Sequence, residues 1–194
     1  MNIFISGSIS INKLPKSAIQ KIENIIRKNY TILIGDARGV DFHTQKYLLK
    51  NNYDNVLVYF AGEKIRNNVG NWKTKNIKAF SNEKGRDLYT LKDKAMAHDA
   101  DYGLMIWDGE SQGTLNNILT MKSENKKFFV VLEEMLVDSE HIDPIVDVYY
   151  KQNKKVDSMI YSNNAGDLHT FPASPNGFTI QDSCSICIPT KFSA

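Results

Sequence analysis

The chain has 194 residues, of which 42% are hydrophobic and 24% charged, a composition typical of one soluble globular domain with a small appendage. Its 24 Lys and Arg residues nearly balance its 22 Asp and Glu residues, and a net charge of +2 disfavours nucleic acid as a partner. The first residues lack the features of a signal peptide, and no apolar run approaches the roughly 20 residues of a membrane span. We therefore expect a cytoplasmic protein with no membrane partner.

Short apolar runs of strand length alternate along the chain with segments whose apolar residues recur at helical spacing. The pattern predicts strands at residues 3–6, 31–34, 55–60, 102–107 and 128–132. Between them it predicts helices at residues 16–28, 40–50, 87–99 and 115–124. Continuous apolar strands that alternate with helices are typical of a parallel sheet covered on both faces.

The expected fold is α/β, a Rossmann-like three-layer domain over residues 1–135 with a mostly parallel sheet of about five strands. After Leu132 the alternation stops, and Val146–Tyr150 fits either a helix or a strand. Residues 136–194 are assigned to a C-terminal extension whose structure the sequence does not define. Within the domain, residues 62–85 are polar and irregular, and a long stretch of this kind is often a functional loop.

Small and polar residues gather directly after three of the expected strands. They occupy residues 6–8, 35–41 and 108–114. Ligands of open parallel sheets bind outside the carboxyl ends of the strands. Glycines there admit a ligand close to the backbone, and the N–H groups of a helix start favour an anion. Chain geometry alone explains one such turn, but three on one sheet edge predict a binding site.

Gly113-Thr114 is the expected phosphate seat, because it opens a helix directly after a buried strand. Asp36 and Asp108 are expected beside a ribose or base, and Arg66 and Lys92 are candidate phosphate contacts from the 62–96 stretch. The predicted ligand-binding residues are Gly7, Ser8, Gly35, Asp36, Arg38, Gly39, Arg66, Lys92, Asp108, Gly109, Ser111, Gly113 and Thr114.

Two aromatic residues of the same stretch, Trp72 and Tyr89, are candidates for stacking on a base. The alternative for Trp72 is a place at the edge of the core. Cys184 and Cys187 form a single C-x-x-C pair, and a closed structural zinc site takes four ligands, so we expect no metal. We expect no cofactor either.

The string Ile34–Asp41, together with Gly7-Ser8 and residues 111–114, resembles the SLOG superfamily. That group includes the DNA-processing protein A fold, the lysine-decarboxylase-like phosphoribohydrolases and nucleotide-binding modules of bacterial signalling and defence systems. The resemblance covers roughly residues 1–133. Its most specific part runs from Lys92-Asp93 to Gly113-Thr114 and is similar to a small bacterial branch of the superfamily.

The resemblance implies a Rossmann-like domain whose Gly-Thr turn holds a nucleotide phosphate. The related phosphoribohydrolases carry a glutamate three residues after the threonine, where it helps to cleave an N-glycosidic bond. Here that position is Asn117, and an amide does not act as a nucleophile or general base. The Gly-Gly that opens the family's motif is replaced by Glu110-Ser111, so the two departures count against hydrolysis but not against binding.

Three hypotheses follow for the function. The first is a sensor, carrier or sequestering module for a nucleotide or nucleotide-derived signal. The second is an N-glycosidase or transferase that takes its catalytic carboxylate from Asp36, Asp108 or Glu110. The third is a single-stranded DNA binder, which the near-neutral charge disfavours. The resemblance also implies a homo-oligomer.

Overall fold

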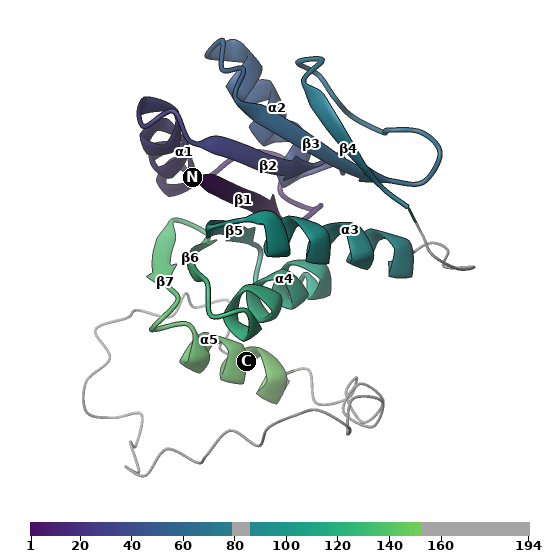
Figure 1. The fold of residues 1–194 in the computed structure, drawn as a ribbon. Coiled ribbons are helices and arrows are strands. Elements are labelled where there is room, and N and C mark those ends of the chain that lie inside the picture. Colours follow the sequence, from purple (N-terminus) through teal and green to yellow (C-terminus); the bar gives the residue numbers. More distant parts are fainter. Residues whose placement is uncertain (79–85, 153–194) are drawn as a thin grey trace. The chain divides into compact units, whose positions relative to one another are not determined.

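Strands and helices alternate along the chain in the computed structural model, which describes residues 1–78 and 86–152 (Figure 1). The strands are β1 (Asn2–Gly7), β2 (Thr31–Gly35), β3 (Val56–Ala61), β4 (Lys73–Ile77), β5 (Tyr102–Trp107), β6 (Lys127–Leu132) and β7 (Met135–Asp138). The helices are α1 (Lys16–Arg27), α2 (Val40–Lys50), α3 (Arg86–Asp99), α4 (Gln112–Ser123) and α5 (Asp143–Gln152). The predicted α/β class with a mostly parallel sheet is confirmed.

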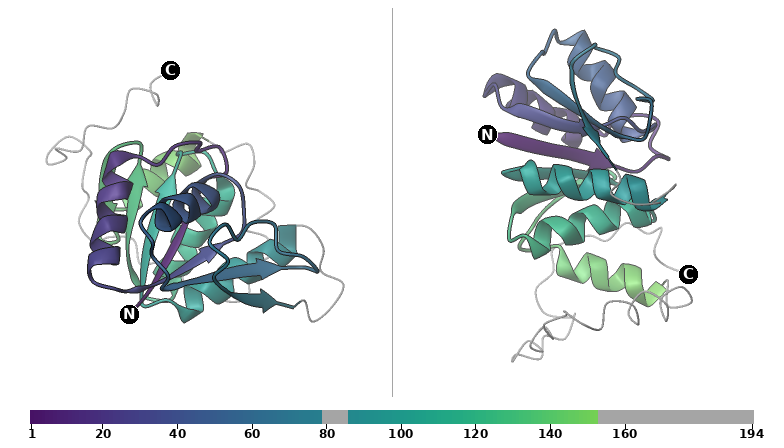
Figure 2. Two further views of the ribbon diagram at one scale, coloured as in Figure 1. Left: turned by 90° about the horizontal axis from the view of Figure 1, so that it is seen from above. Right: turned by 45° about the vertical axis from the view of Figure 1, so that its right-hand side comes forward.

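The strands form one sheet in the order β4-β3-β2-β1-β5-β6-β7, and Figure 2 shows it from two further sides. The first six strands are parallel, and β7 pairs antiparallel with β6. The chain moves outward from β1 to β4 and then returns through α3 to β5 on the other side of β1. The strand order therefore reverses between β1 and β5, which is where open α/β sheets bind their ligands.

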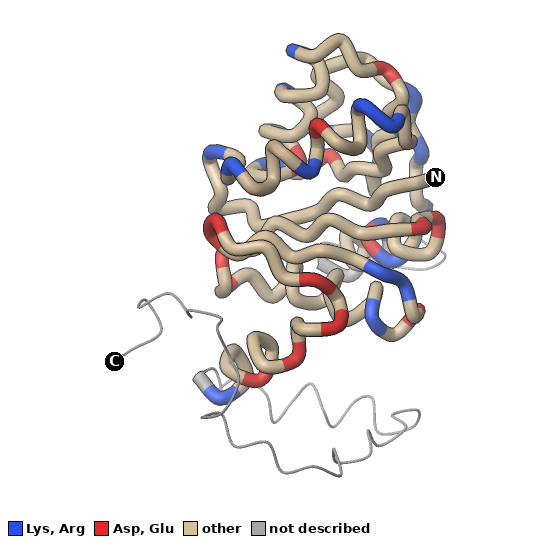
Figure 3. Tube along the Cα trace, turned by 90° about the vertical axis from the view of Figure 1, so that its left-hand side faces the viewer, with Lys and Arg blue, Asp and Glu red and all other residues tan. Residues whose placement is uncertain are grey.

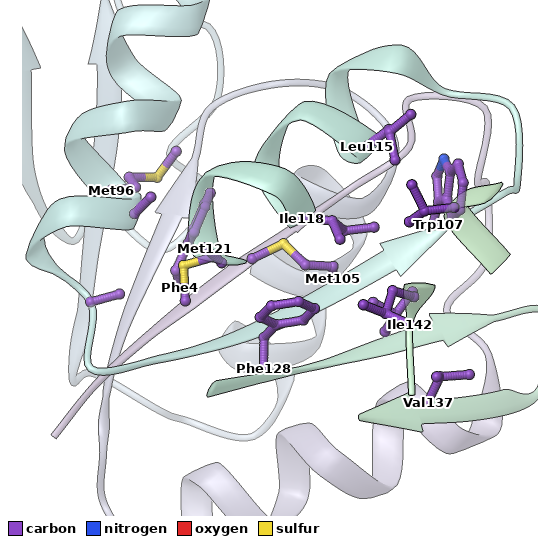
Figure 4. Packing of buried hydrophobic residues seen from close by; sticks show 14 of the residues in the cluster. Phe4, Met96, Met105, Trp107, Leu115, Ile118, Met121, Phe128, Val137 and Ile142 are labelled. Atoms are coloured by element: carbon purple, nitrogen blue, oxygen red, sulfur yellow. The ribbon is translucent and has the colours of Figure 1, made fainter. Parts of the chain in front are cut away.

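Both faces of the sheet are buried, each against its own set of helices. Along β1, Ile3 and Ile5 join the core beneath α1 and α2, whereas Phe4 joins the core beneath α3 and α4. This alternation follows from the two-residue period of a strand. Figure 4 shows the second core, in which Met105 and Phe128 pack among side chains of α3 and α4. Burial on both sides explains why the strands are continuously apolar.

The sheet has seven strands, two more than the sequence pattern predicts. Strand β4 lies inside the stretch expected to be irregular, because its residues Lys-Thr-Lys-Asn-Ile lack apolar alternation. It forms an edge of the sheet, and the first four of its side chains are exposed. An exposed edge strand has no need of an apolar face, and lysines there discourage pairing with other chains. The other missed strand, β7, has only four residues.

Residues after 135 also belong to the compact unit, which runs from Met1 to Gln152. Val137 of β7, Ile142, and Val146 and Tyr149 of α5 are buried in the same core as Trp107. The compact unit therefore continues past residue 135. Val146–Tyr150, whose sequence fits either a helix or a strand, is part of helix α5. Cys184 and Cys187 lie outside the described residues. Among the described residues, no helix is long and apolar enough to cross a membrane.

Replacing Ile142 by Ala tests whether β7 and α5 are part of the folding unit. The Ile142 side chain is fully buried, so I142A should lower the free energy of unfolding by about 2–4 kcal/mol. Leu136 on β7 is 39% exposed, and L136A should cost less than about 1 kcal/mol. Urea unfolding measures both. Equal, small losses would show that the core ends before β7.

Candidate functional site

Two groups of polar side chains lie at the carboxyl edge of the sheet. The first, the Lys92 cluster, consists of Asp36, Asp41, Arg66, Lys92 and Asp93. The second, the switch-point site, lies between the ends of β1 and β5 and consists of Ser8, Ser10, Asp108, Ser111, Gly113 and Thr114. Three of the predicted ligand residues, Asp36, Arg66 and Lys92, belong to the Lys92 cluster. Five others, Ser8, Asp108, Ser111, Gly113 and Thr114, belong to the switch-point site, and the surroundings of the two groups differ.

The ammonium group of Lys92 is buried against carboxylates. Lys92 on α3 is only 3% exposed, and its Nζ lies 3.2 Å from Oδ1 of Asp93 and 3.9 Å from Oδ1 of Asp36. A third carboxylate, that of Asp41, lies near the ammonium beside Gly35. A Cβ added to Gly35 would lie 2.3 Å from Asp41 Oδ2 and 2.4 Å from Lys92 Nζ. A buried charge is tolerated only with such partners. Lys92 therefore holds α3 against the end of β2.

The predicted ribose acceptor Asp36 and the predicted phosphate contact Arg66 bind each other. Asp36 is fully buried and accepts hydrogen bonds from the Arg66 backbone N–H (3.0 Å), Nε (3.1 Å) and Nη2 (2.5 Å). Burial alone would raise the pKa of Asp36, but these bonds and the charge of Lys92 lower it. The arginine side chain also lies over the Tyr89 ring, 4.3 Å from its centroid.

Two amide side chains, those of Asn67 and Gln45, hold the connection after β3 in place. Asn67 Nδ2 donates to the Asp36 carbonyl over 2.8 Å. The buried Gln45 of α2 donates to the Gly35 carbonyl (2.9 Å) and accepts from the Val69 N–H (3.1 Å). The connection that follows β3 is thus tied to the end of β2 and to the middle of α2. Asn67 lies beside Arg66 in the stretch expected to be a functional loop, but nothing in the sequence indicates which backbone groups the Asn67 or Gln45 side chain will reach.

Asp41 is the member of the cluster with the strongest tendency to hold a proton. It lies in the first turn of α2, is almost completely buried, and accepts a hydrogen bond from the Ala37 N–H over 3.1 Å. Burial raises its pKa to about 6, against the opposing attraction of Lys92 and with a further increase from the charge of Asp93. Asp41 lies in the polar stretch 35–41 and Asp93 in the Lys92-Asp93 pair of the resemblance, but neither is among the predicted ligand-binding residues.

At the switch-point site, the end of β1 is joined to the first two turns of α4. The buried hydroxyls of Ser8 and Thr114 lie 3.2 Å apart, and the Asp108 N–H donates to Ser8 Oγ over 3.1 Å. One turn further along α4, Asn117 Nδ2 donates to Ser6 Oγ over 2.8 Å. Asn117 therefore joins α4 to β1 at the position where the resemblance implies a glutamate.

Asp108 shapes the loop before α4. Its Oδ1 accepts from the N–H groups of Glu110 (3.0 Å) and Ser111 (2.8 Å), and its Oδ2 accepts from the Ser10 hydroxyl. Burial would raise the pKa of Asp108, but these hydrogen bonds and one with Ser8 lower it. A carboxyl of this kind is ionised at neutral pH and does not donate a proton. The other candidate acid of this loop, Glu110, is exposed.

Helix α4 begins at Gln112, earlier than the predicted Leu115, with Ser111 as its N-cap. Ser111 Oγ accepts from the Thr114 N–H at 3.5 Å, whereas the first amides of a helix, here those of Gln112 and Gly113, lack intrahelical acceptors. An added Cβ on the exposed Gly113 would find only Ser111 Oγ, at 3.9 Å. The position predicted to bind a phosphate is thus the start of a helix, and the space beside Gly113 is open.

Three of the predicted glycines are packed against protein atoms. An added Cβ would lie 2.2 Å from the Ile106 carbonyl at Gly7, and 2.5 Å from the Ser8 carbonyl at Gly39, which has a φ of 70°. Gly35 lies against the Lys92 cluster. These glycines are predicted as points of ligand approach, but in the structure their lack of a side chain lets the turns pack together. Gly113 is the exception.

The remaining predicted residues lie outside both hydrogen-bonding groups or serve the core. Arg38 is exposed on the loop after β2 and makes no ion pair within the described part of the chain. Gly109 is buried with a φ of 80°. Trp72 is 7% exposed and donates from Nε1 to the Tyr53 carbonyl, so it belongs to the core rather than to a stacking site. Tyr89 is 38% exposed beneath Arg66.

Comparison of the chain with family models, with curated proteins and with solved structures finds no match. The chemistry of the site therefore carries the functional argument. Within residues 1–78 and 86–152, no group of three or more His, Cys, Asp or Glu side chains is arranged to hold a metal ion.

Replacing Asp41 by Asn should change how stability depends on pH. The folded pKa of about 6 exceeds the ordinary 3.8, so Asp41 contributes stability that is fully present below about pH 4 and is lost as pH rises through 6. D41N removes this loss and retains an acceptor for the Ala37 N–H. Its free energy of unfolding relative to the native protein should therefore rise by roughly 1–3 kcal/mol between pH 4 and pH 7. A constant difference across that range would contradict the assignment.

Gly39 and Gly113 form a matched pair that separates packing from open space. G39A forces a side chain onto the Ser8 and Ile9 backbone at a positive φ and should lower the free energy of unfolding by about 1–3 kcal/mol or more. G113A meets no atom closer than 3.9 Å and should change it by less than about 1 kcal/mol. Thermal unfolding of both variants measures the difference. Equal effects would mean that Gly39 is not packed as described.

Proposed function

We propose that this protein binds a nucleotide or a nucleotide-derived signalling molecule and holds its phosphate at the first turn of α4. The observation that carries the proposal is the start of α4 at the point where the strand order reverses, with Gly113 open in front of it. Backbone N–H groups and the positive end of the helix dipole favour an anion there. The role is that of a sensor, carrier or sequestering module.

Arg38 is the cation that best complements this phosphate. Its loop packs on the turn after β1, since Gly39 lies against the Ser8 and Ile9 backbone and the Val40 N–H donates to the Ser8 carbonyl over 3.3 Å. An exposed guanidinium beside the switch point is suited to a phosphate because it donates several hydrogen bonds at once. Arg66 and Lys92 serve the Lys92 cluster instead, and Asp108 keeps the start of α4 in position.

A small nucleotide suits this protein better than a nucleic acid. The net charge is only +2, and Figure 3 shows acidic as well as basic positions on the described part of the chain. Affinity for a long polyanion comes largely from many neutralised phosphates, which requires a continuous basic track. The resemblance to the SLOG superfamily, which implies a phosphate at the Gly-Thr turn, agrees with the proposal. Membership of that superfamily, a cytoplasmic location and a homo-oligomeric state remain proposals.

The proposal predicts that the purified protein retains a nucleotide intact. The protein is incubated with nucleoside monophosphates, dinucleotides and cyclic nucleotides, separated from free ligand, denatured and chromatographed. G113D adds a carboxylate where the phosphate binds and should weaken binding of the retained nucleotide by about tenfold or more. G113A, which adds only a methyl group in open space, is the matched control and should bind within about threefold of the native protein. Unchanged affinity in G113D would overturn the phosphate assignment.

An N-glycosidase acting on nucleoside phosphates is the second candidate, and Asp93 favours it. The Asp93 carboxylate is 24% exposed, lies 3.4 Å from Asn117 Nδ2, and is paired with Lys92. It offers an acidic group beside the amide that replaces the expected glutamate. Of the carboxylates predicted for this role, Asp36 is enclosed by Arg66 and Asp108 is occupied by the N–H groups of its own loop. The third, Glu110, is exposed. A glycosidic bond requires an acid or nucleophile near the anomeric carbon.

The same incubation distinguishes the two candidates. Free base and ribose phosphate that accumulate with turnover would identify an enzyme, and D93N should then abolish turnover while the nucleotide still binds. D108N serves as the comparison, since the Asp108 carboxylate holds the loop before α4 in place. If the nucleotide is recovered without loss after long incubation, the glycosidase candidate is rejected and the binding module stands.

A further inference from the structure

A groove of about 420 Å³ lies at the amino edge of the sheet, opposite the switch-point site. Its walls are the second half of α1 and the first residues of β1, β5 and β6. Helix α1 starts over the β6–β7 turn, where Glu134 accepts hydrogen bonds from the N–H groups of Lys16 and Ser17, each 3.2 Å long. The volume falls within the range of small-molecule sites, roughly 300–1,000 Å³.

Aromatic rings form one side of this groove. Tyr102 and Phe129 pack with ring centroids 5.8 Å apart, and Tyr30 lines the groove beside them. Apolar atoms contribute most of the lining, including those of Ile3 and Leu104. An aromatic or otherwise flat apolar body is the chemistry that such walls favour.

The opposite side of the groove is cationic and carries no acidic residue. Lys21, Asn24 and Lys28 line it from α1 at positions i, i+3 and i+7, which lie on one helix face. Lys21 Nζ lies 3.7 Å from the Phe129 ring centroid, and Lys28 Nζ lies 5.8 Å from that of Tyr30. Neither lysine forms an ion pair with another described residue.

Structural needs of the helix explain only part of this arrangement. Lys28 follows the last turn of α1, where the dipole favours a cation. Lys21 lies in the middle of the helix, and its ammonium lies over an aromatic ring inside the groove rather than beside a carboxylate. A cation held in this way is available to an anion that enters with an apolar body.

We propose that this groove is a second ligand site, which binds a small molecule with an aromatic body and one anionic group, such as a carboxylate, sulfonate or phosphate. The body packs against Phe129, Tyr102 and Tyr30. The anionic group pairs with Lys21 or Lys28 and accepts from Asn24. The site does not depend on the nucleotide proposal, since it lies at the other edge of the sheet.

The test uses 1-anilinonaphthalene-8-sulfonate, an aromatic sulfonate, and its neutral analogue N-phenyl-1-naphthylamine as probes. Fluorescence titration of the full-length native protein should show one saturable site for the sulfonate. The double variant K21Q/K28Q should weaken sulfonate binding by about tenfold or more and change binding of the neutral probe by less than about twofold. K46Q is the matched control, because Lys46 also lies near an aromatic ring, that of Phe42 at 5.5 Å, but on α2.

Amide chemical shifts locate the probe and complete the test. Shifts confined to residues 21–30 and 102–104 would support the site, whereas shifts centred on residues 108–114 would overturn it. Equal losses in K21Q/K28Q and K46Q, or no saturable binding by protein with an unchanged thermal transition, would also overturn it. Nucleotides should not displace the sulfonate, and displacement would show that the two sites are one.

Discussion

The buried ammonium of Lys92 is the constraint on which the carboxyl edge of the sheet depends. A cation without solvent must be surrounded by carboxylates, and Asp36, Asp41 and Asp93 come to it from three different elements. Asp36 in turn binds Arg66, which fixes the connection after β3. The buried charge of Lys92 thus fixes the positions of β2, α2, α3 and the connection after β3 relative to one another. Among these carboxylates, burial raises the pKa of Asp41 to about 6, although the charge of Lys92 opposes the increase.

This arrangement divides the polar edge into two parts with different capacities. The charged side chains of the Lys92 cluster bind one another, so little of their hydrogen-bonding capacity remains for a ligand. The switch-point site combines the Asp108 carboxylate, which holds the loop, with hydroxyls and with the backbone N–H groups at the start of α4, where the helix dipole attracts an anion. Asp93, partly exposed and 3.4 Å from Asn117 Nδ2, lies between the two parts, and it is the carboxylate on which the second candidate function rests.

The sequence predicts the helices and strands whose apolar side chains pack in the core. It does not predict a strand whose side chains are mostly exposed. Helix 40–50 and strand 102–107 have the expected bounds because their apolar patterns reflect contact with the core. Strand β4 was missed because an exposed edge strand carries no such pattern. Asp36 and Arg66 stand out in the sequence as site residues, but their mutual pairing depends on how β2 and β3 align. The same holds for Gly7 and Gly39, whose turns pack together, whereas Gly113 is exposed.

The most direct test is a titration of the native protein with a retained nucleoside phosphate, followed by backbone amide chemical shifts. A phosphate at the start of α4 predicts that the largest shifts occur at Gln112 and Gly113, with a further change at Arg38. Arg66 and Lys92 should remain nearly unaffected, because their partners are within the protein. Large shifts at Arg66 and Lys92 with α4 unchanged would contradict the division of the edge and move the ligand to the Lys92 cluster.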